Sequence, residues 1–571
     1  MRRRPRSVFA RGLECLESRR LLASFLVSNP GEFGPGTLAD AIFQANAMPG
    51  PDVVQFNIPG PGPHTIAMTT AALPPILDEL IVDGTSQPGY AGAPLIQIDN
   101  AGPALIGLEV NASASQVKGL SITGFPLGIK ITGSNVIVSS NYIGMLPDGM
   151  TAVPNQIGIE SVGANFTTIG GVTAGAGNVI AFGQPIAGVG VRINGGASVR
   201  VVGNRIGTTA SGLLANGSVG TGVSVEGNAG ADIGLLNNPA SGNVIAGING
   251  NGILLGFGGV AVSRNRVGIN AADAPLGNSG DGILVYDGGH VIDDVNTIAH
   301  NGGNGITIDG PSTRVSVVGN SIYSNGRMGI DLNNDGVTPN DPGDLDSGPN
   351  DLQNYGHDLD LRRLPGGQVR FRGHLDSLPS TSFYIDFYLS PTRDPSGFGE
   401  GQTFIGTEIV TTNSSGTATW NFNSTGSYPA NQWVSVLVES FALTGVSEFS
   451  KAAKIYIPGD INGDGLINNQ DIAGFVLALT NPAQFDTDYP ETPWLAADIN
   501  DDGIVNNQDI APFVALLISP PPITTSRPER PEPARTTPRT FARVPIRAML
   551  DSQETVASSP RAPARSVTLV L

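Results

Sequence analysis

Two twelve-residue stretches near the C-terminal end carry the residue types and the spacing of a divalent-cation site. They read DINGDGLINNQD from residue 460 and DINDDGIVNNQD from residue 498, so they are offset by 38 residues throughout. Each has side-chain oxygens at positions 1, 3, 5, 9 and 12, glycine at position 6 for the sharp turn, and a backbone carbonyl to offer at position 7. Hard oxygen ligands at this spacing predict one calcium ion per stretch. The predicted ligands are Asp460, Asn462, Asp464, Leu466 (through its carbonyl), Asn468 and Asp471, then Asp498, Asn500, Asp502, Ile504 (through its carbonyl), Asn506 and Asp509.

Each stretch is followed by apolar residues at helical spacing. Ile472, Phe475, Val476 and Leu479 follow the first, and Ile510, Phe513, Val514 and Leu517 follow the second. This spacing predicts two amphipathic helices whose apolar faces pack together. Loop plus exiting helix, duplicated over residues 458–518 with Asp rather than Glu at position 12, resembles the type I dockerin. The resemblance implies a calcium-folded module that docks onto a cohesin-like protein, with partner choice at loop positions 10 and 11, which are Asn469, Gln470, Asn507 and Gln508.

Residues 331–351 form another region dense in carboxylates, asparagines and turn formers. Oxygen ligands at short spacing suit calcium here too, but no ligand periodicity defines a geometry. Two interpretations stay open, a further calcium site and a solvated acidic loop. The candidate ligands are Asp335, Asp341, Asp344 and Asp346.

A short sequence phrase recurs in the part of the chain that precedes these sites. A phrase of glycine, isoleucine or valine, any residue and an aliphatic residue starts at 128, 158, 190, 222, 252, 282, 305 and 329, the copy at 158 being looser. Periods of 23 to 32 residues are typical of stacked repeats. Each period holds two more short apolar segments, separated by Gly and Asn that tolerate positive φ at corners. Residues 116–362 are therefore predicted to form a parallel β-coil with three strands per turn.

Polar inserts interrupt every second turn of this coil. They span residues 145–157, 208–221 and 269–281 and follow the related phrases NYIG, NRIG and NRVG. If the register holds, the three inserts project from one side of the coil, and insertions on one face of a solenoid often mark its binding face.

Residues 24–115 are expected to hold an N-terminal cap and the first turns. Leu38, Ile42 and Ala45 lie on one side of a predicted short helix over 36–46, which would cover the exposed sheet edge at the start of the coil. This helix and the phrase IVDGTSQPGY at 81–90 resemble the opening of right-handed β-helix domains in bacterial surface proteins of the CSLREA type. The resemblance implies a right-handed, pectate-lyase-like parallel β-helix.

Residues 363–457 change to alternating strands, at 369–375, 383–389, 417–422 and 433–439. Strands at this density predict an antiparallel β-sandwich, and the segment resembles the immunoglobulin-like modules that often follow such β-helices. The expected fold class is thus mainly β: a right-handed parallel β-helix solenoid, an antiparallel β-sandwich, and a small α-helical dockerin with two calcium loops.

Charge is segregated along the 571 residues. The chain carries 31 basic and 49 acidic residues; setting aside the seven Arg and two Glu of residues 1–23, and the eight Arg and four acids of residues 519–571, leaves a middle of net −27. Such an acidic middle disfavours nucleic acid and favours cations.

The single cysteine, Cys15, excludes a disulfide framework. The Pro- and Arg-rich tail, 519–571, is expected to be disordered.

The basic N-terminal residues 1–23 lack the clean apolar core of an ordinary signal peptide. The phrase LESRRLL at 16–22 nevertheless resembles the LEPR-x-LL segment of planctomycete exported proteins, with Ser18 where that family usually has Pro. This resemblance implies a secreted or cell-surface protein, exported through a non-standard segment. No transmembrane segment is expected.

Three functions remain open for the β-helix: binding of a glycan or surface, catalysis on a polysaccharide, and self-association alone. Parallel β-helices of this kind include pectate lyases and polygalacturonases, and a glycosidase needs two carboxylates flanking the scissile bond. The third positions of the repeated phrase offer no adjoining acids, and the best catalytic candidates are His290, Asp293 and Asp294. We favour a non-catalytic β-helix that contacts a polysaccharide or surface glycan and is attached through the dockerin. The alternative is a dockerin-tethered polysaccharide lyase or glycoside hydrolase.

Overall fold

The structure, a computed structural model, describes residues 22–519 except 184–186, 228, 294, 312, 425 and 442–444. Most of the predicted export segment and nearly all of the predicted disordered tail lie outside the described residues. The chain divides into two compact units. One contains the residues up to 337 together with 347–350, and the other contains 338–346 and the residues from 351 onward.

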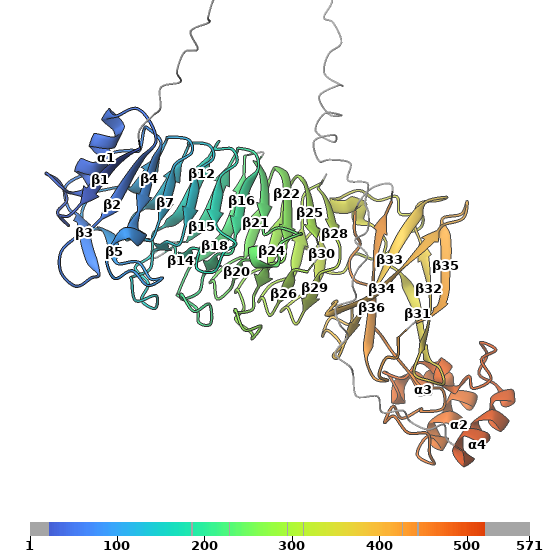
Figure 1. The fold of residues 1–571 in the computed structure, drawn as a ribbon. Helices are drawn as coiled ribbons and strands as arrows, with labels where there is room; N and C mark the ends of the chain where they lie inside the picture. Colours follow the sequence, from blue (N-terminus) through green and yellow to red (C-terminus); the bar gives the residue numbers. More distant parts are fainter. Residues whose placement is uncertain are drawn as a thin grey trace, which may run out of the picture. The chain divides into compact units, whose positions relative to one another are not determined.

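The first unit is a parallel β-helix with three long sheets (Figure 1). Every neighbouring pair of strands in these sheets is parallel, and each sheet takes about one strand from each turn of the chain. The prediction of a coil with three strands per turn is therefore confirmed. Sheet 1 contains β1 (Ala23–Val27), β2 (Asp52–Phe56), β4 (Leu80–Asp83), β7 (Gln116–Lys118), β10 (Ile137–Ser139), β13 (Thr168–Gly170), β16 (Val199–Val202), β19 (Ala229–Ile233), β22 (Gly258–Ser263), β25 (Gly289–Asp293) and β28 (Arg314–Val317).

The other two sheets complete each turn. Sheet 2 contains β3 (His64–Met68), β5 (Ile96–Asn100), β8 (Leu120–Thr123), β11 (Tyr142–Ile143), β14 (Val179–Ile180), β17 (Arg205–Ile206), β20 (Val244–Ile245), β23 (Arg266–Val267), β26 (Thr297–Ala299) and β29 (Ser321–Tyr323). Sheet 3 contains β6 (Ile106–Val110), β9 (Leu127–Ile131), β12 (Ile157–Val162), β15 (Gly188–Asn194), β18 (Gly220–Glu226), β21 (Ile253–Leu255), β24 (Ile283–Val285), β27 (Ile306–Ile308) and β30 (Ile330–Leu332).

The repeated phrases lie in register in sheet 3. Ile129 pairs with Ile159 and, one turn on, Ile159 pairs with Val191, and their side chains are fully buried. An earlier copy at 107–110, in β6, also pairs in this register with β9. This copy does not fit the repeated phrase, because leucine takes the place of isoleucine or valine.

Close stacking explains the glycine that opens each phrase. A Cβ added to Gly128 would lie 2.6 Å from the carbonyl oxygen of Gly158, and one added to Gly158 would lie 2.5 Å from that of Gly190. The same contact recurs at Gly190, Gly222, Gly252, Gly282 and Gly305, at 2.5–2.6 Å. Here glycine is needed for the close approach of two backbones rather than for a positive φ.

A column of buried asparagines runs along one corner of the coil. Each side-chain amide nitrogen donates to the side-chain oxygen of the next asparagine at 2.8–3.2 Å. In addition, Asn204 donates from Nδ2 to the carbonyl of Ile169 and from its backbone N–H to Oδ1 of Asn243. Since each amide satisfies backbone groups of neighbouring turns, the column seals a corner from which water is excluded. Its members are Asn141, Asn178, Asn204, Asn243, Asn265, Asn296 and Asn320.

The predicted N-terminal helix is α1 (Leu38–Ala47), which packs on β1 and β2. Thr37 accepts a hydrogen bond from the backbone of Asp40 at its first turn, and Leu38, Ile42 and Ala45 are buried. The helix therefore covers the start of the coil, where β1 would otherwise present an open edge.

The second unit contains two antiparallel sheets that pack face to face around one apolar core. Phe371 stacks on Phe422 in the same sheet at 5.1 Å and meets Phe387 of the opposite sheet edge-on at 5.2 Å. Sheet 4 contains β31 (His357–Arg363), β32 (Val369–Asp376) and β35 (Thr417–Asn423), and sheet 5 contains β34 (Thr403–Thr411), β33 (Ser382–Ser390), β36 (Trp433–Ser440) and β37 (Ala453–Lys454).

The boundary predicted between 362 and 363 falls inside the sandwich. β30, the last strand of the coil, ends at Leu332, and β31 already pairs with β32. β31 gives only a weak strand signal in the sequence, because its alternation is carried by Leu359 and Leu361 among charged residues. Of the described helices, none has the length and apolar character that a bilayer crossing requires.

Replacing Asn204 by alanine should destabilise the β-helix selectively. The substitution leaves several buried backbone and amide groups without partners, so we expect a loss of about 3 kcal/mol. The three tryptophans, Trp420, Trp433 and Trp494, all lie in the second unit. In guanidinium denaturation the circular dichroism transition should shift to lower denaturant while the tryptophan fluorescence transition stays in place. Exposed Asn237→Ala is the control, and equal midpoints for the two variants would contradict the role of the column.

Candidate calcium-binding module

The first predicted calcium loop is closed by the carboxylate of Asp471, which is fully buried. Its Oδ1 accepts from the backbone N–H groups of Ile461 and Asn462 at 2.7 and 3.0 Å, and its Oδ2 accepts from that of Asn468 at 2.9 Å. Position 12 therefore ties both halves of the loop together. Asp460 Oδ2 accepts from the N–H of Gly465 at 2.9 Å, which holds the turn at position 6.

The second loop repeats this pattern 38 residues later. Asp509 is fully buried and accepts from the N–H groups of Ile499, Asn500 and Asn506 at 2.8, 3.1 and 2.9 Å. Asp498 Oδ2 accepts from Gly503 N–H at 2.9 Å, as its counterpart does in the first loop. The two segments therefore share most of their hydrogen bonds. They differ at position 1, where Asp498 Oδ1 accepts from the N–H of Asp502 at 3.2 Å and Asp460 Oδ1 has no hydrogen-bond partner.

The first loop has the electrostatics of a cation site. Asp460 is 3% exposed, and its Oδ1 is buried without a hydrogen-bond partner. Burial raises the pKa of Asp460 to about 6, and the nearby carboxylates of Asp471 and Asp464 add to the rise. An oxygen that is buried, unpaired and surrounded by like charge calls for a cation. The predicted donor set therefore fits calcium, whose charge would stabilise the ionised form of every carboxylate in the loop.

The helices that leave the loops pack through only part of their predicted apolar faces. The rings of Phe475 in α2 (Ile472–Thr480) and Phe513 in α4 (Ile510–Ile518) stack at 4.0 Å in the core of the module. The prediction that the whole stripe packs inward is wrong, because four of its members are 42–50% exposed. These are Ile472 and Val476 on α2, and Ile510 and Val514 on α4. Each helix thus buries one phenylalanine and presents an aliphatic pair to solvent.

Between the two helices lies α3 (Pro482–Asp488), which the sequence pattern did not reveal. Proline stands in its first turn, and the side chain of Asn481 caps it by accepting from the backbone of Gln484. Phe485 contributes its one buried side chain to the module core. The short length of the helix left too little periodicity to detect.

The second loop also contacts the sandwich. Arg362 of β31 donates to the carbonyls of Asp498 and Ile499 at 2.7 and 3.1 Å, and its guanidinium lies 3.4 Å from Asp501. Arg370 of β32 donates to Asp501 as well. Partial burial raises the pKa of Asp501, but these arginines outweigh that effect and hold it below its usual range. Position 4 of the first loop is glycine, so this contact distinguishes the two loops.

Residues 458–513 match the dockerin type I domain family. The match covers both loops, α2 and α3, and the beginning of α4. No curated protein matches the chain. The enzymatically active domain of tailspike protein 4 from bacteriophage CBA120 matches at 11% sequence identity with a TM-score of 0.20, over 74% of this chain and 66% of that one. This chain thus spans slightly less than two thirds of that structure, a likeness too low to support any conclusion about activity.

Outside the dockerin, the structure gathers three of the four weaker calcium candidates. Ligand oxygens of Asp341, Asp344 and Asp346 lie within 4.8 Å of one another, whereas Asp335 accepts from Asn333 Nδ2 and is not part of the group. Burial raises the pKa of Asp344 to about 6, although Ser377 and the backbone of Asn354 donate to it. One oxygen each of Asp341 and Asp346 is buried without a partner.

The described members of the predicted catalytic group do not converge. His290 and Asp293 lie on β25, where His290 is 2% exposed and points inward while Asp293 points outward. Nδ1 of His290 accepts from the N–H of Val260, and Nε2 lies 2.7 Å from the carbonyl oxygen of Asp287 and 2.9 Å from that of Gly256. Burial lowers the pKa of His290, so the neutral ring acts as a bridge between turns. Asp294 lies outside the described residues.

The three predicted inserts do stack on one side of the coil. Each is a small hairpin closed by an antiparallel bridge. The N–H of Ala210 in the second insert donates to Gly149 of the first, and the N–H of Ala271 in the third donates to Gly212 of the second, both at 2.9 Å. The inserts therefore form one continuous surface alongside sheet 2.

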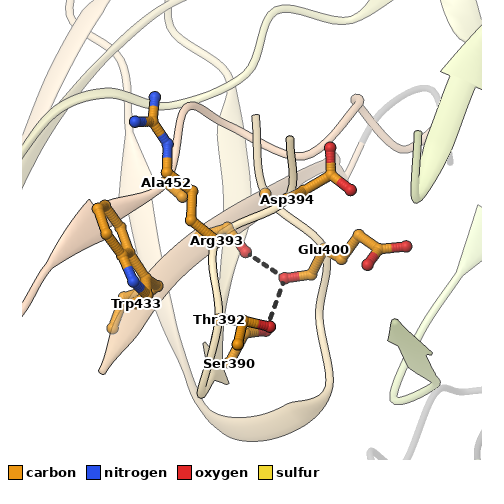
Figure 2. A pocket seen from close by; sticks show the side chains of 10 residues that line it. Ser390, Thr392, Arg393, Asp394, Glu400, Trp433 and Ala452 are labelled. Atoms are coloured by element: carbon orange, nitrogen blue, oxygen red, sulfur yellow. Dashed lines mark hydrogen bonds between the residues drawn. The ribbon is translucent and has the colours of Figure 1, made fainter. Parts of the chain in front are cut away.

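A shallow hollow lies on the sandwich beside Trp433 (Figure 2). The guanidinium of Arg393 lies 5.4 Å from the centre of the Trp433 ring, and the ammonium of Lys454 lies 5.9 Å from it. The oxygen of Glu400 that accepts from Ser390 and Ser435 is its backbone carbonyl. The hollow contains none of the predicted site residues.

Calcium removal should unfold the dockerin module. Without the ion, the clustered carboxylates repel one another, so chelator should abolish the helical circular dichroism of residues 458–518. Asp471→Ala removes the acceptor of three backbone N–H groups as well as a ligand. We expect it to lower the unfolding free energy by about 3 kcal/mol and to remove one bound ion in calorimetry. Exposed Asp486→Ala is the control, and an unchanged spectrum after chelation would contradict the prediction.

Proposed function

We propose that this chain is a secreted or cell-surface protein whose dockerin module attaches it, in a calcium-dependent way, to a cohesin-like partner. The observation that carries the proposal is the duplicated pair of loops, in which a buried aspartate at position 12 accepts from the same three backbone N–H groups 38 residues apart. Calcium organises the loops, and the loops position the helices that face the partner.

The docking surface is formed by polar and apolar residues that recur in both halves of the dockerin. Asn469 and Gln470 are exposed at the end of the first loop, next to the exposed Ile472 and Val476 of α2. Asn507, Gln508, Ile510 and Val514 repeat this arrangement in the second half. Exposed aliphatic side chains together with exposed amides suit a protein interface, since apolar area gives affinity and amides select the partner.

Because the surface is duplicated, changing one half should leave the other able to bind. Gln470→Ala with Val476→Asp should weaken binding to a responsive type I cohesin by no more than a few-fold. Adding Gln508→Ala and Val514→Asp should weaken it at least a hundred-fold. Surface plasmon resonance against a panel of cohesin domains in calcium measures both, with exposed Thr487→Ala as the control. Tight cohesin binding by the variant with all four substitutions, or binding that persists after a chelator removes calcium, would refute the proposal.

For the β-helix we propose glycan binding along sheet 2. Each insert packs beside an outward residue of its own turn: Tyr142 lies next to Gly149, Arg205 lies next to Gly212, and Arg266 pairs with Asp273 at 2.6 Å. Along this surface the ring of Tyr142 supplies an aromatic face on which a sugar can stack. The guanidinium groups of Arg205 and Arg266 supply hydrogen-bond donors for a polysaccharide. The polysaccharide lyase or hydrolase remains the second candidate, because such a surface would also hold a substrate.

Affinity electrophoresis in pectin, alginate and sulfated glycans tests this surface. For a glycan that retards the parent protein, Tyr142→Ala and Arg205→Ala should each raise the dissociation constant at least five-fold. Arg200→Ala, an exposed arginine of sheet 1 paired with Asp232, should leave it unchanged. Equal retardation of all variants would contradict the proposed face. Release of sugar products that Asp293→Asn abolishes would instead favour the enzyme.

We further propose that the Asp341, Asp344 and Asp346 group takes a third calcium ion. Three convergent carboxylates with two unpaired buried oxygens support it. The calorimetric titration of the dockerin loops also tests this site, because Asp344→Asn should then lower the ion count of the full chain by one while both dockerin ions remain.

A further inference from the structure

Two of the five histidines of the chain face each other across β31 and β32 in sheet 4. His357 pairs directly with His374, and their rings stack at 5.8 Å with an interplanar angle of 30°. Both rings are partly exposed, at 32% and 52%. Imidazole nitrogens brought together at this distance are the ligands that zinc and similar transition metals prefer.

A β-bulge brings a carboxylate to the same place. The register shifts after His357, so that Asp358 and Leu359 together oppose the single residue Gly373. Asp358 adopts φ of +51°, and Leu359 packs toward the sandwich core. In a regular strand Asp358 would point to the face opposite His357, whereas the extra residue keeps it on the histidine side. Asp358 Oδ2 lies 3.0 Å from Nδ1 of His357 and 3.7 Å from Nδ1 of His374.

A fourth side chain sets the proton position on His357. Its Nε2 lies 3.1 Å from Oδ2 of Asp376, two residues beyond His374 on β32. When Nε2–H donates to Asp376, a neutral ring has only a lone pair at Nδ1, and that lone pair faces the carboxylate of Asp358. This contact is a hydrogen bond when Nδ1 carries a proton, and a metal ion can take the place of that proton. A carboxylate that accepts the remote N–H of a ligating histidine is the usual outer partner in zinc sites.

The neighbouring charges leave this group available. The next pair on the two strands, Asp360 and Arg372, has partners of its own. Asp360 accepts from the hydroxyl of Tyr456 at 2.7 Å and lies 3.5 Å from Arg370, and Arg372 lies 3.8 Å from Asp360. The ligand atoms of His357, Asp358 and His374 all lie within 4.8 Å of one another, and the chain is strongly acidic overall. Three protein ligands on an exposed surface leave a coordination position for water or for a group from another molecule.

We propose that His357, His374 and Asp358 bind a divalent transition metal of the zinc class, with Asp376 as the outer partner of His357. The ion joins the bulge of β31, an edge strand of sheet 4, to β32. It is distinct from the calcium sites in ligand chemistry, because two imidazole nitrogens select against calcium. The site is independent of the proposed function, since it does not use the dockerin loops or the insert surface.

Zinc titration of the full chain tests the site. Isothermal calorimetry is run in saturating calcium at neutral pH, with Cys15→Ser in every sample so that no thiolate competes. We expect one zinc ion per chain, and His374→Ala should weaken its binding at least ten-fold. Asp376→Asn should weaken it about ten-fold through the outer contact. His300→Ala, a histidine of the β-helix stacked edge-on with Tyr323, should bind zinc like the parent.

Cobalt provides a second readout that does not depend on heat. Bound cobalt should give visible absorption bands that zinc displaces and that His374→Ala lacks. Unchanged far-ultraviolet circular dichroism and calcium stoichiometry in His374→Ala would show that the variant folds. Absence of zinc binding in the parent, or equal zinc affinity in His374→Ala and His300→Ala, would overturn the proposal.

Discussion

The close approach of one turn to the next is the constraint on which the β-helix depends. Parallel strands stack about 4.8 Å apart, and at that spacing the backbone of sheet 3 leaves no room for a Cβ at Gly128 or its counterparts. The same spacing lets one asparagine amide reach the next along the buried corner. The insert hairpins also depend on it, because they meet each other only when the turns beneath them are held at a regular repeat. A binding face on this coil therefore repeats with the same regular spacing as the turns beneath it.

Features that repeat could be predicted from the sequence, since each copy strengthens the signal of the others. The recurring phrase predicted sheet 3 and its register, and the 38-residue offset predicted two equivalent loops. The short helix at α1 was also predicted, because three apolar residues at helical spacing are enough to define a buried face. In all these cases the information is local or periodic, and tertiary packing only confirms it.

Features that depend on a single distant contact could not be predicted. Ile472 and Val476 have the same helical spacing as Phe475, and only the packed module decides that the phenylalanine is buried while the aliphatic pair is exposed. The predicted grouping of His290 with Asp293 is not seen in the structure. The two residues are close in sequence, but they lie on opposite faces of β25 because side chains alternate along a strand. His357 and His374 were missed because strand pairing, which sequence spacing does not encode, brings them together.

Asp501 shows how one substitution between repeated loops links two modules. It is the polar residue at position 4 where the first loop has Gly463, and it meets Arg362 and Arg370, both nearly buried. A buried guanidinium without its carboxylate is costly, and Arg362 also relies on carbonyls at positions 1 and 2 of the second loop. If calcium folds that loop, the ion also supports these arginine contacts with the sandwich. The first loop has glycine at position 4 and makes no such ion pair there. The two halves of the dockerin therefore differ in this contact with the sandwich, although their exposed surfaces are alike.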